Sequence, residues 1–225
     1  MRSKWTGRSI GKEKAEGVPD GLALFRPLEF YVIDFEQLKE NIQACRLCRD
    51  EFGFEPHPFF HGGRHSRIMQ ISQAPSRRVH GSLRPFDAPS GRNLRQWYGL
   101  DETAFYNSDN FYFSAMAHCY PGKTAKGDLP PPKRCAQWLV REMEAVDSQM
   151  YVIVGRKAAE FLFPEGEFSR LVFGDQMLKG KSALVLPHPS PRNINWLRRQ
   201  DFAERLIEVR KKIHEVLDLN EAVSP

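Results

Sequence analysis

The sequence predicts an α/β fold, a three-layer α/β/α sandwich around a short, mainly parallel sheet of four strands. Four apolar runs lie at residues 67–72, 110–118, 150–155 and 182–187, and helical patterns separate them. The apolar character of each run is nearly continuous, which is typical of strands that are covered on both faces. Alternation of such strands with helices favours a parallel sheet between two helical layers.

The elements of the first half follow in a simple order. A helical pattern, "DFEQLKENIQAC" at 34–45, precedes the first strand, "RIMQIS". A second helical pattern, "GRNLRQWYGL" at 91–100, follows that strand, and the second strand is "NFYFSAMAH" at 110–118. The long segment between the first strand and the second helix is therefore a loop at one end of the sheet.

The second half repeats the alternation. The segment 130–146 begins with three prolines, which suit the start of a helix, and its apolar residues recur at helical spacing. The remaining elements are the strand "MYVIVG" at 150–155, a helix at 156–163, the strand "SALVLP" at 182–187 and a long amphipathic helix at 201–219.

Length and composition indicate one folded domain. The chain has 225 residues, a formal net charge of +5 and a pI near 9.1, a mild basic excess that favours polyanionic partners. We expect a basic N-terminal arm at 1–27 and a single domain at 28–225. No apolar run is long enough to cross a membrane, and the basic N-terminus does not resemble a secretory signal. We therefore expect a cytoplasmic monomer without membrane contact.

Polar residues follow three of the four strands. In parallel α/β sheets, ligands bind outside the carboxyl ends of the strands. That rule selects the loops 73–91, 119–129 and 188–196, which are all rich in Pro, Gly, Ser, Arg or His. The third loop opens with "HPSPRN", a proline-stiffened turn that carries a histidine directly after a buried strand. The sequence thus predicts a binding site at this edge of the sheet.

The chain has four cysteines, Cys45, Cys48, Cys119 and Cys135. Cys45 and Cys48 form a C-x-x-C pair, and fifteen residues separate Cys119 from Cys135. In a cytosolic chain, such a pair points to metal binding or redox chemistry rather than to a structural disulfide. Four thiolates suit either a [4Fe–4S] cluster or zinc, and the spacing does not separate the two. Alternatively, Cys119 and Cys135 are simply small buried residues.

Together these loops and cysteines resemble the uracil-DNA glycosylase superfamily, most closely its iron–sulfur-cluster-bearing families. The resemblance rests on Ala74-Pro75, Pro85-Phe86 and Ser90-Gly91 in that order, on "HPSP" at 188–191, and on the order of the four cysteines. It covers residues 40–196. It implies an enzyme that hydrolyses the N-glycosidic bond of uracil or a related deaminated base in DNA after flipping that base into a pocket. It also implies that the four cysteines hold a structural [4Fe–4S] cluster.

The resemblance assigns roles to residues at the pocket. Phe86 would stack on the flipped base, and His188 would donate a hydrogen bond to the base oxygen on which negative charge develops. Gln73 and the backbone near Ala74 would line the other side of the base. Both residues also have a purely structural interpretation. Phe86 could belong to the hydrophobic core, and His188 could cap the end of a strand.

Other residues would contact the DNA backbone by the same resemblance. A guanidinium at Arg192, where related enzymes have an apolar wedge, could stack in the gap left by the base and neutralise phosphate, or simply be solvated at the surface. The segments around the two proline-serine steps would grip the flanking phosphates. The implied DNA-binding residues are Pro75, Ser76, Ser190, Arg192 and Asn193.

Two positions depart from the family pattern. Gln73 stands where the cluster-bearing families often have an acidic residue, and Ala115 stands where an asparagine normally reads the uracil edge. His80, between the first strand and Phe86, is a candidate for orienting water or acting as a nucleophile, or is a surface histidine near phosphate. Asp87 is a second candidate carboxylate.

These departures leave two further classes of function. The first is a non-catalytic nucleic-acid-binding protein of the same fold with a structural iron–sulfur cluster, which agrees with alanine at position 115. The second is a redox-sensing iron–sulfur protein in which the "HPSPRN" loop is only a turn. Formation of abasic sites in damaged DNA separates the glycosylase from both.

Overall fold

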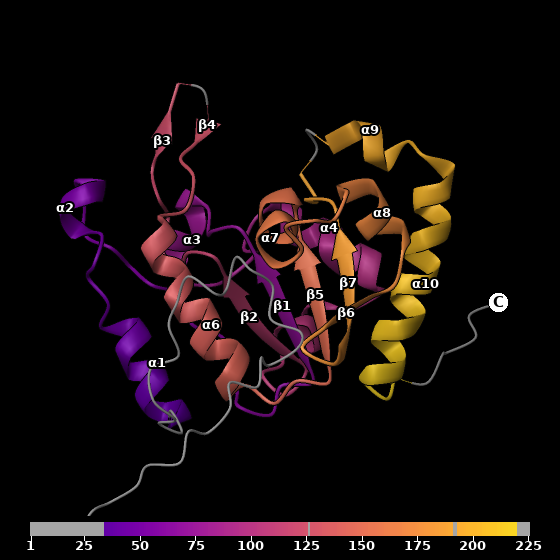
Figure 1. Ribbon diagram of the computed structural model, residues 1–225, viewed down its shortest axis with the longest axis horizontal. Coiled ribbons are helices and arrows are strands. Elements are labelled where there is room, and N and C mark those ends of the chain that lie inside the picture. Colours follow the sequence, from indigo (N-terminus) through magenta and orange to yellow (C-terminus); the bar gives the residue numbers. More distant parts are fainter. Residues whose placement is uncertain (1–33, 126, 191–192, 220–225) are drawn as a thin grey trace, which may run out of the picture.

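The computed structural model describes residues 34–125, 127–190 and 193–219. Its centre is a five-stranded sheet in the order β2-β1-β5-β7-β6 (Figure 1). The strands β1 (Ile68–Ser72), β2 (Phe111–Ala115), β5 (Met150–Val154) and β7 (Lys181–Leu186) run parallel. Every residue of β1, β2 and β5 is buried, which explains their continuous apolar runs. The predicted α/β fold with a mainly parallel sheet is confirmed.

The sheet has one strand more than the four that the sequence predicts. The additional strand, β6 (Gln176–Leu178), pairs antiparallel with β7 at the edge of the sheet. Its three residues are too short for a recognisable apolar run, and the central one, Met177, is 65% exposed. A two-stranded hairpin, β3 (Lys123–Thr124) and β4 (Gly127–Asp128), stands apart from the main sheet.

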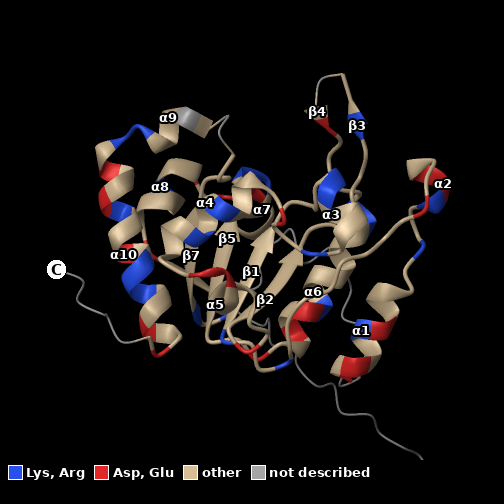
Figure 2. Cartoon of the chain, turned by 180° about the vertical axis from the view of Figure 1, so that it is seen from behind, with Lys and Arg blue, Asp and Glu red and all other residues tan. Residues whose placement is uncertain are grey.

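Helices cover both faces of the sheet (Figures 1 and 2). On one face, α6 (Ala136–Ala145) packs on β2 and against α1 (Phe35–Gln43), and α7 (Arg156–Leu162) packs on β5. On the other face, α4 (Pro89–Tyr98) lies between the sheet and α10 (Gln200–Val216), with Trp97 edge-on to Phe202. These five helices correspond to the five that the sequence predicts.

The remaining short elements lie in segments that the sequence leaves as loops. They were not predicted because each is only one or two turns long and has no complete apolar period. The predicted helix at 130–146 starts late, since consecutive prolines hold the preceding residues in extended conformation; a 3₁₀ turn, η1, comes first. The short elements are α2 (Arg49–Phe52), α3 (Arg77–Ser82), α5 (Glu102–Tyr106), η1 (Lys133–Cys135), α8 (Phe168–Phe173) and α9 (Ile194–Leu197).

A buried carboxylate joins α6 to β2. Glu142 is fully buried and accepts hydrogen bonds from the Tyr112 hydroxyl at 2.7 Å, from the Ser114 hydroxyl and from His118 Nε2 at 3.0 Å. The His118 Nδ1 atom contacts the Phe59 carbonyl at 3.0 Å. Although burial by itself lowers the pKa of His118, Glu142 and the Phe59 carbonyl raise it above its ordinary value. Because this side chain directly precedes Cys119, the network fixes the backbone where the chain leaves β2.

Over the described ranges, no helix is long and apolar enough to cross a membrane. The predicted arm at 1–27 lies outside the described residues.

Candidate functional site

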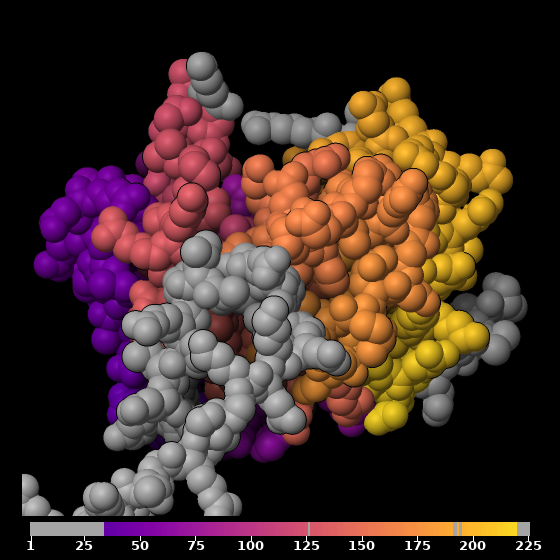
Figure 3. Space-filling model, in the orientation of Figure 1, coloured from indigo at the N-terminus to yellow at the C-terminus, as the bar shows by residue number. Residues whose placement is uncertain are grey.

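A cavity of about 170 Å³ opens at the carboxyl edge of the parallel strands. Its wall is formed by the loops after β1 and β7, by the segment that enters α4 and by the β3–β4 hairpin, which stands out from the surface in Figure 3. All three loops that the sequence selects therefore reach this cavity. Six of the predicted site residues line it, namely Gln73, Ala74, Pro75, Ser76, Phe86 and His188.

Phe86 is held rigidly at the cavity wall. Its backbone has φ +56°, in the left-handed region that residues other than glycine rarely adopt. Its ring packs against Phe113, with centroids 5.6 Å apart, and against Phe105 at 6.3 Å. A Cβ atom at Gly91 would lie only 1.9 Å from the Phe86 carbonyl oxygen, so glycine is required there for the helix α4 to approach. The strained backbone is therefore held by packing from two sides.

The hydrogen bonds of the strand-end loop determine the tautomer of His188. The Ser190 backbone N–H donates to His188 Nδ1 at 3.2 Å, so in the neutral ring the proton resides on Nε2. More than a third of this side chain is accessible, yet the walls of the recess desolvate it and lower its pKa, against the opposing effect of Asp128. The imidazole at neutral pH is thus an uncharged donor through Nε2.

Two asparagines fix the backbone around His188. Asn193 donates to the His188 carbonyl at 2.6 Å, and Asn93 of α4 donates to the Pro189 carbonyl at 2.8 Å. Asn193 therefore helps to hold the loop, and its contact with DNA stays a prediction. Ser190 lies in the same loop, and Arg192 lies outside the described residues.

The loop after β1 continues the sheet into the cavity. The backbone N–H groups of Met116 and Ala117 donate to the carbonyls of Ser72 and Gln73 at 3.0 and 3.2 Å, so the β1–β2 pairing extends to the pocket. Ser76 then caps α3 by accepting from the Val79 N–H at 3.5 Å. The positions of Gln73 and Ser76 therefore follow from the strand and the helix on either side of them.

Two of the residues proposed to act on the base or on water, Ala115 and His80, do not line the cavity. Ala115 is fully buried at the end of β2, opposite Ser72 in the strand register. His80 stacks on His57, with ring centroids 4.6 Å apart, and contacts Phe54 at 5.3 Å. Burial, and then the nearby His57, lower the pKa of His80. The described contacts of His80 are thus with this aromatic group, away from the cavity wall.

Other wall residues were not singled out in the sequence. Phe59 comes from the loop before β1, and Pro121, Asp128 and Leu129 come from the loop 119–129 that contains the hairpin. Loop 119–129 was identified as a site loop, but no pattern within it distinguishes the residues that face inward. Asp87, the second candidate carboxylate, is instead paired with Arg78 at 3.1 Å and does not line the cavity.

The sequence of the chain was matched to known proteins on its own residues, independently of the pocket. Residues 59–210 match the family model of the uracil DNA glycosylase superfamily.

The chain belongs to that superfamily.

A curated relative, the Type-4 uracil-DNA glycosylase of Archaeoglobus fulgidus, is 23% identical over 131 residues. The alignment covers 57% of this chain, and the chain spans 63% of the length of that relative. The resemblance that the sequence motifs carry is therefore confirmed at the level of the superfamily.

The four cysteines of this superfamily member lie on three neighbouring segments. Cys45 and Cys48 lie between α1 and α2, Cys119 begins the loop after β2, and Cys135 ends η1; all four thiols are free. Burial raises the pKa of the Cys135 thiol to about 12, and the charges of Cys48 and Cys45 add to the shift. The pKa of the Cys119 thiol is raised further, first by burial and then by the charges of the other three cysteines. All four thiols are therefore within electrostatic range of one another.

The four thiols form a donor set of sulfur alone, which suits zinc or an iron–sulfur cluster. In the described part of the chain, no three His, Cys, Asp or Glu side chains form a group that could hold a metal ion. A zinc ion with Zn–S bonds of about 2.3 Å needs four sulfurs about 3.8 Å apart. Burial is the largest effect on the pKa of Cys119 and of Cys48 and raises both; nearby Arg46 and Arg134 lower them, respectively. The donor set is four sulfurs, the set that iron–sulfur clusters use.

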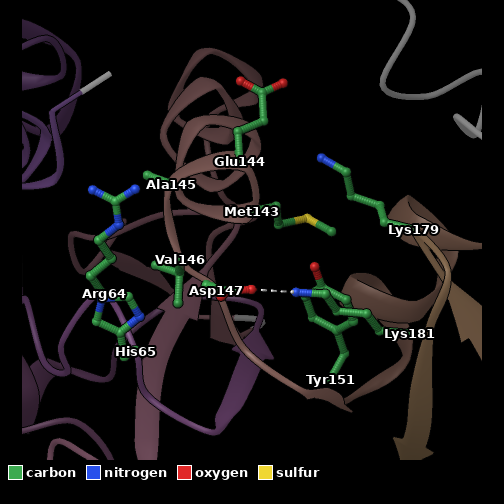
Figure 4. Close-up of a pocket in the computed structure, with 10 residues that line it drawn as sticks. All are labelled: Arg64, His65, Met143, Glu144, Ala145, Val146, Asp147, Tyr151, Lys179 and Lys181. Carbon is green, nitrogen blue, oxygen red and sulfur yellow. Dashed lines mark hydrogen bonds and ion pairs between the residues drawn. The ribbon is translucent and has the colours of Figure 1, made fainter. Parts of the chain in front are cut away.

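A second cavity, of about 350 Å³, lies at the opposite end of the sheet (Figure 4). Arg64 and His65 lie on one side of it and Lys179 and Lys181 on the other. Lys181 is paired with Asp147 at 3.3 Å. No residue proposed from the sequence lines this cavity. It is at the amino ends of the parallel strands, where ligands of such sheets do not usually bind.

Proposed function

We propose that the protein is a DNA glycosylase that hydrolyses the N-glycosidic bond of uracil, or of a related deaminated base, after the nucleotide is flipped out of the duplex. The observation that carries this proposal is the convergence of Phe86 and His188 on one cavity. The two residues are about a hundred positions apart in the sequence. Membership of the superfamily and the similarity to the Type-4 uracil-DNA glycosylase of Archaeoglobus fulgidus support it.

The chemistry of the pocket matches the demands of this reaction. Cleavage of the bond leaves negative charge on the base, and the fixed Nε2–H of His188 is a donor that needs no reorientation to stabilise it. The Phe86 ring offers an aromatic surface on which a base can stack. Removal of a single preorganised donor of this kind typically lowers the rate by about 10²- to 10³-fold.

The size of the cavity favours a single-ring base. A cavity of roughly 150 Å³ holds a benzene ring, and this one measures about 170 Å³. We therefore expect uracil to be removed in preference to hypoxanthine and xanthine, which are purines with two fused rings. Among the described wall residues, Gln73 is the one with a side-chain amide. Position 115 supplies none, because it is an alanine and does not line the cavity.

Formation of abasic sites tests the proposal. The purified chain is incubated with oligonucleotides that carry uracil, hypoxanthine or xanthine, and alkali-sensitive strand breaks are measured. Uracil DNA should be cut after alkali, and His188→Ala should cut it about 10²- to 10³-fold more slowly. Gly81→Ala is a suitable control because a Cβ at Gly81 meets nothing within 4 Å.

The second candidate is a nucleic-acid-binding protein that does not cleave. The buried Ala115 favours it, because no amide at that position reads the edge of the base. Retention of uracil-containing DNA without any alkali-sensitive sites would support this alternative and would refute the glycosylase.

We further propose that Cys45, Cys48, Cys119 and Cys135 hold a [4Fe–4S] cluster. Four neighbouring cysteine thiols support this proposal, because iron–sulfur clusters are held by cysteine thiolates. When bound, the cluster would cross-link the α1–α2 segment to the loop beside the pocket and so serve as a scaffold. Protein purified without oxygen should absorb at roughly 400 nm and contain about four iron atoms per chain. Stoichiometric zinc instead of iron would contradict the proposal, and Cys135→Ser should abolish the absorbance.

A further inference from the structure

The cavity wall contains one carboxylate over the described ranges, that of Asp128. It comes from β4 of the hairpin, in the loop between Cys119 and Cys135, and not from the loop after β1. In Figure 2 the end of β4 is red, whereas neighbouring α3 and β3 carry basic residues. A negative charge in this pocket needs an explanation, because the phosphates of DNA would repel it.

The hairpin holds Asp128 in a defined place. Asp128 pairs with Lys123 in the antiparallel register, and the Leu129 N–H donates to the Gly122 carbonyl at 3.0 Å. Gly127, immediately before it, has φ +129°, a conformation that favours glycine. The next residue, Leu129, also lines the cavity. The carboxylate is thus presented by a short, specifically shaped turn.

The position of Asp128 relative to His188 indicates that both act on one occupant. Both residues line the same cavity, and the charge of Asp128 opposes the effect of burial on the pKa of His188. No hydrogen bond or ion pair to the Asp128 carboxylate is present within the described part of the chain. Its oxygens are therefore open to accept a hydrogen bond from water.

A carboxylate in this place would assist the hydrolysis of an N-glycosidic bond. As the bond breaks, C1′ of the sugar becomes electron-deficient, and water has to add to it and lose a proton. A carboxylate beside C1′ stabilises the developing positive charge and accepts that proton. Gln73 cannot do so, because a carboxamide is not a base at neutral pH.

We propose that Asp128 is a catalytic residue of this pocket, which binds the attacking water and acts as its general base. The water oxygen forms a bond to C1′ as the C1′–N bond breaks, and the bonding electron pair leaves with the base, stabilised by His188. The water proton passes to the Asp128 carboxylate and from there to the departing base or to solvent. The products are the free base and an abasic sugar with a hydroxyl at C1′. This assignment rests on the proposed glycosylase function.

Single-turnover excision of uracil with enzyme in saturating excess tests the role of Asp128. We expect Asp128→Asn to excise at least about 10²-fold more slowly than the wild type, and Asp128→Glu to recover part of the loss. Binding of the same oligonucleotide, measured separately, should not weaken by more than about threefold, since loss of the carboxylate removes a repulsion and no contact with the phosphates. That separation distinguishes a general base from a residue that merely holds the substrate.

Thr124→Val is the matched control in the same hairpin. It removes the hydroxyl that donates to the Gly127 carbonyl at 3.2 Å and leaves the carboxylate in place. Its excision rate should stay within about threefold of the wild-type rate. An equal loss in Thr124→Val and Asp128→Asn would show that the shape of the hairpin matters and would overturn the catalytic role, as would a wild-type rate in Asp128→Asn. If the wild-type chain excises no base at all, the glycosylase function itself fails and the assignment of Asp128 fails with it.

Discussion

The substitution Gly91→Ala tests whether the Phe86 wall is as tightly built as its geometry indicates. Gly91 lies in the first turns of α4, at a backbone conformation that alanine also adopts. By propensity alone, alanine should stabilise such a helical position by about 0.5–1 kcal/mol. The contact with Phe86 predicts the opposite sign, so the two effects can be separated by experiment.

The magnitude follows from the close approach. A Cβ at Gly91 would lie 1.9 Å from the Phe86 carbonyl oxygen and 2.9 Å from its carbonyl carbon, whereas such contacts are essentially never below 3.0 Å. The Phe86 backbone or the start of α4 must therefore move by at least about 1.1 Å. Overpacking of this kind costs about 1–3 kcal/mol, which exceeds the gain in propensity. A displacement of about 1 Å at a reacting centre lowers a rate by about 10²-fold.

Two measurements check this prediction. Denaturant unfolding should show Gly91→Ala to be about 1–2 kcal/mol less stable than the wild type, and single-turnover excision of uracil should slow by about 10²-fold. Gly81→Ala, in α3, is the control; because nothing lies within 4 Å of its Cβ, stability should stay the same or increase. The reasoning is refuted if Gly91→Ala unfolds and excises as Gly81→Ala does.

Three further predictions concern buried and titrating groups. Glu142→Ala should lower the free energy of unfolding by about 3–5 kcal/mol, because it leaves three buried donors unpaired. The control is Glu144→Ala, on the exposed side of α6, which should change the free energy of unfolding by less than about 0.5 kcal/mol. Tyr98→Phe removes the hydroxyl that donates to the buried Gln70 Oε1 at 2.7 Å and should cost about 1–3 kcal/mol in the same denaturation assay. Burial lowers the pKa of His188, so its contribution to stability should be complete above about pH 6.5 and decline as pH falls through the folded-state pKa. In His188→Gln, the free energy of unfolding should no longer show this dependence on pH. If the dependence is the same in the variant and the wild type, His188 is not its source.

The sequence alone was sufficient for the layers of the fold and the edge that carries the site. Strands covered on both faces require apolar residues at every position, so β1, β2 and β5 stand out as continuous runs. Polar loops after such strands can only meet at one edge of a parallel sheet. The roles of Phe86 and His188, in contrast, were predicted from the resemblance of their motifs to the superfamily and not from the strand pattern. The three-residue strand β6 was not predicted, because so short an edge segment has no pattern to detect.

Tertiary structure decided which loop residues face the cavity. Ala115 and His80 belong to the right segments, yet the strand register buries Ala115 and the aromatic contacts of His80 direct it elsewhere. Asp128 enters the wall only through the hairpin, and the close approach of α4 to the Phe86 carbonyl at Gly91 joins two segments that local sequence pattern does not bring together. Such relations join residues far apart in the chain, and their distances depend on the order of the strands and on side-chain packing. Local sequence pattern determines how a segment folds, but the direction of a loop side chain is determined by what packs against it.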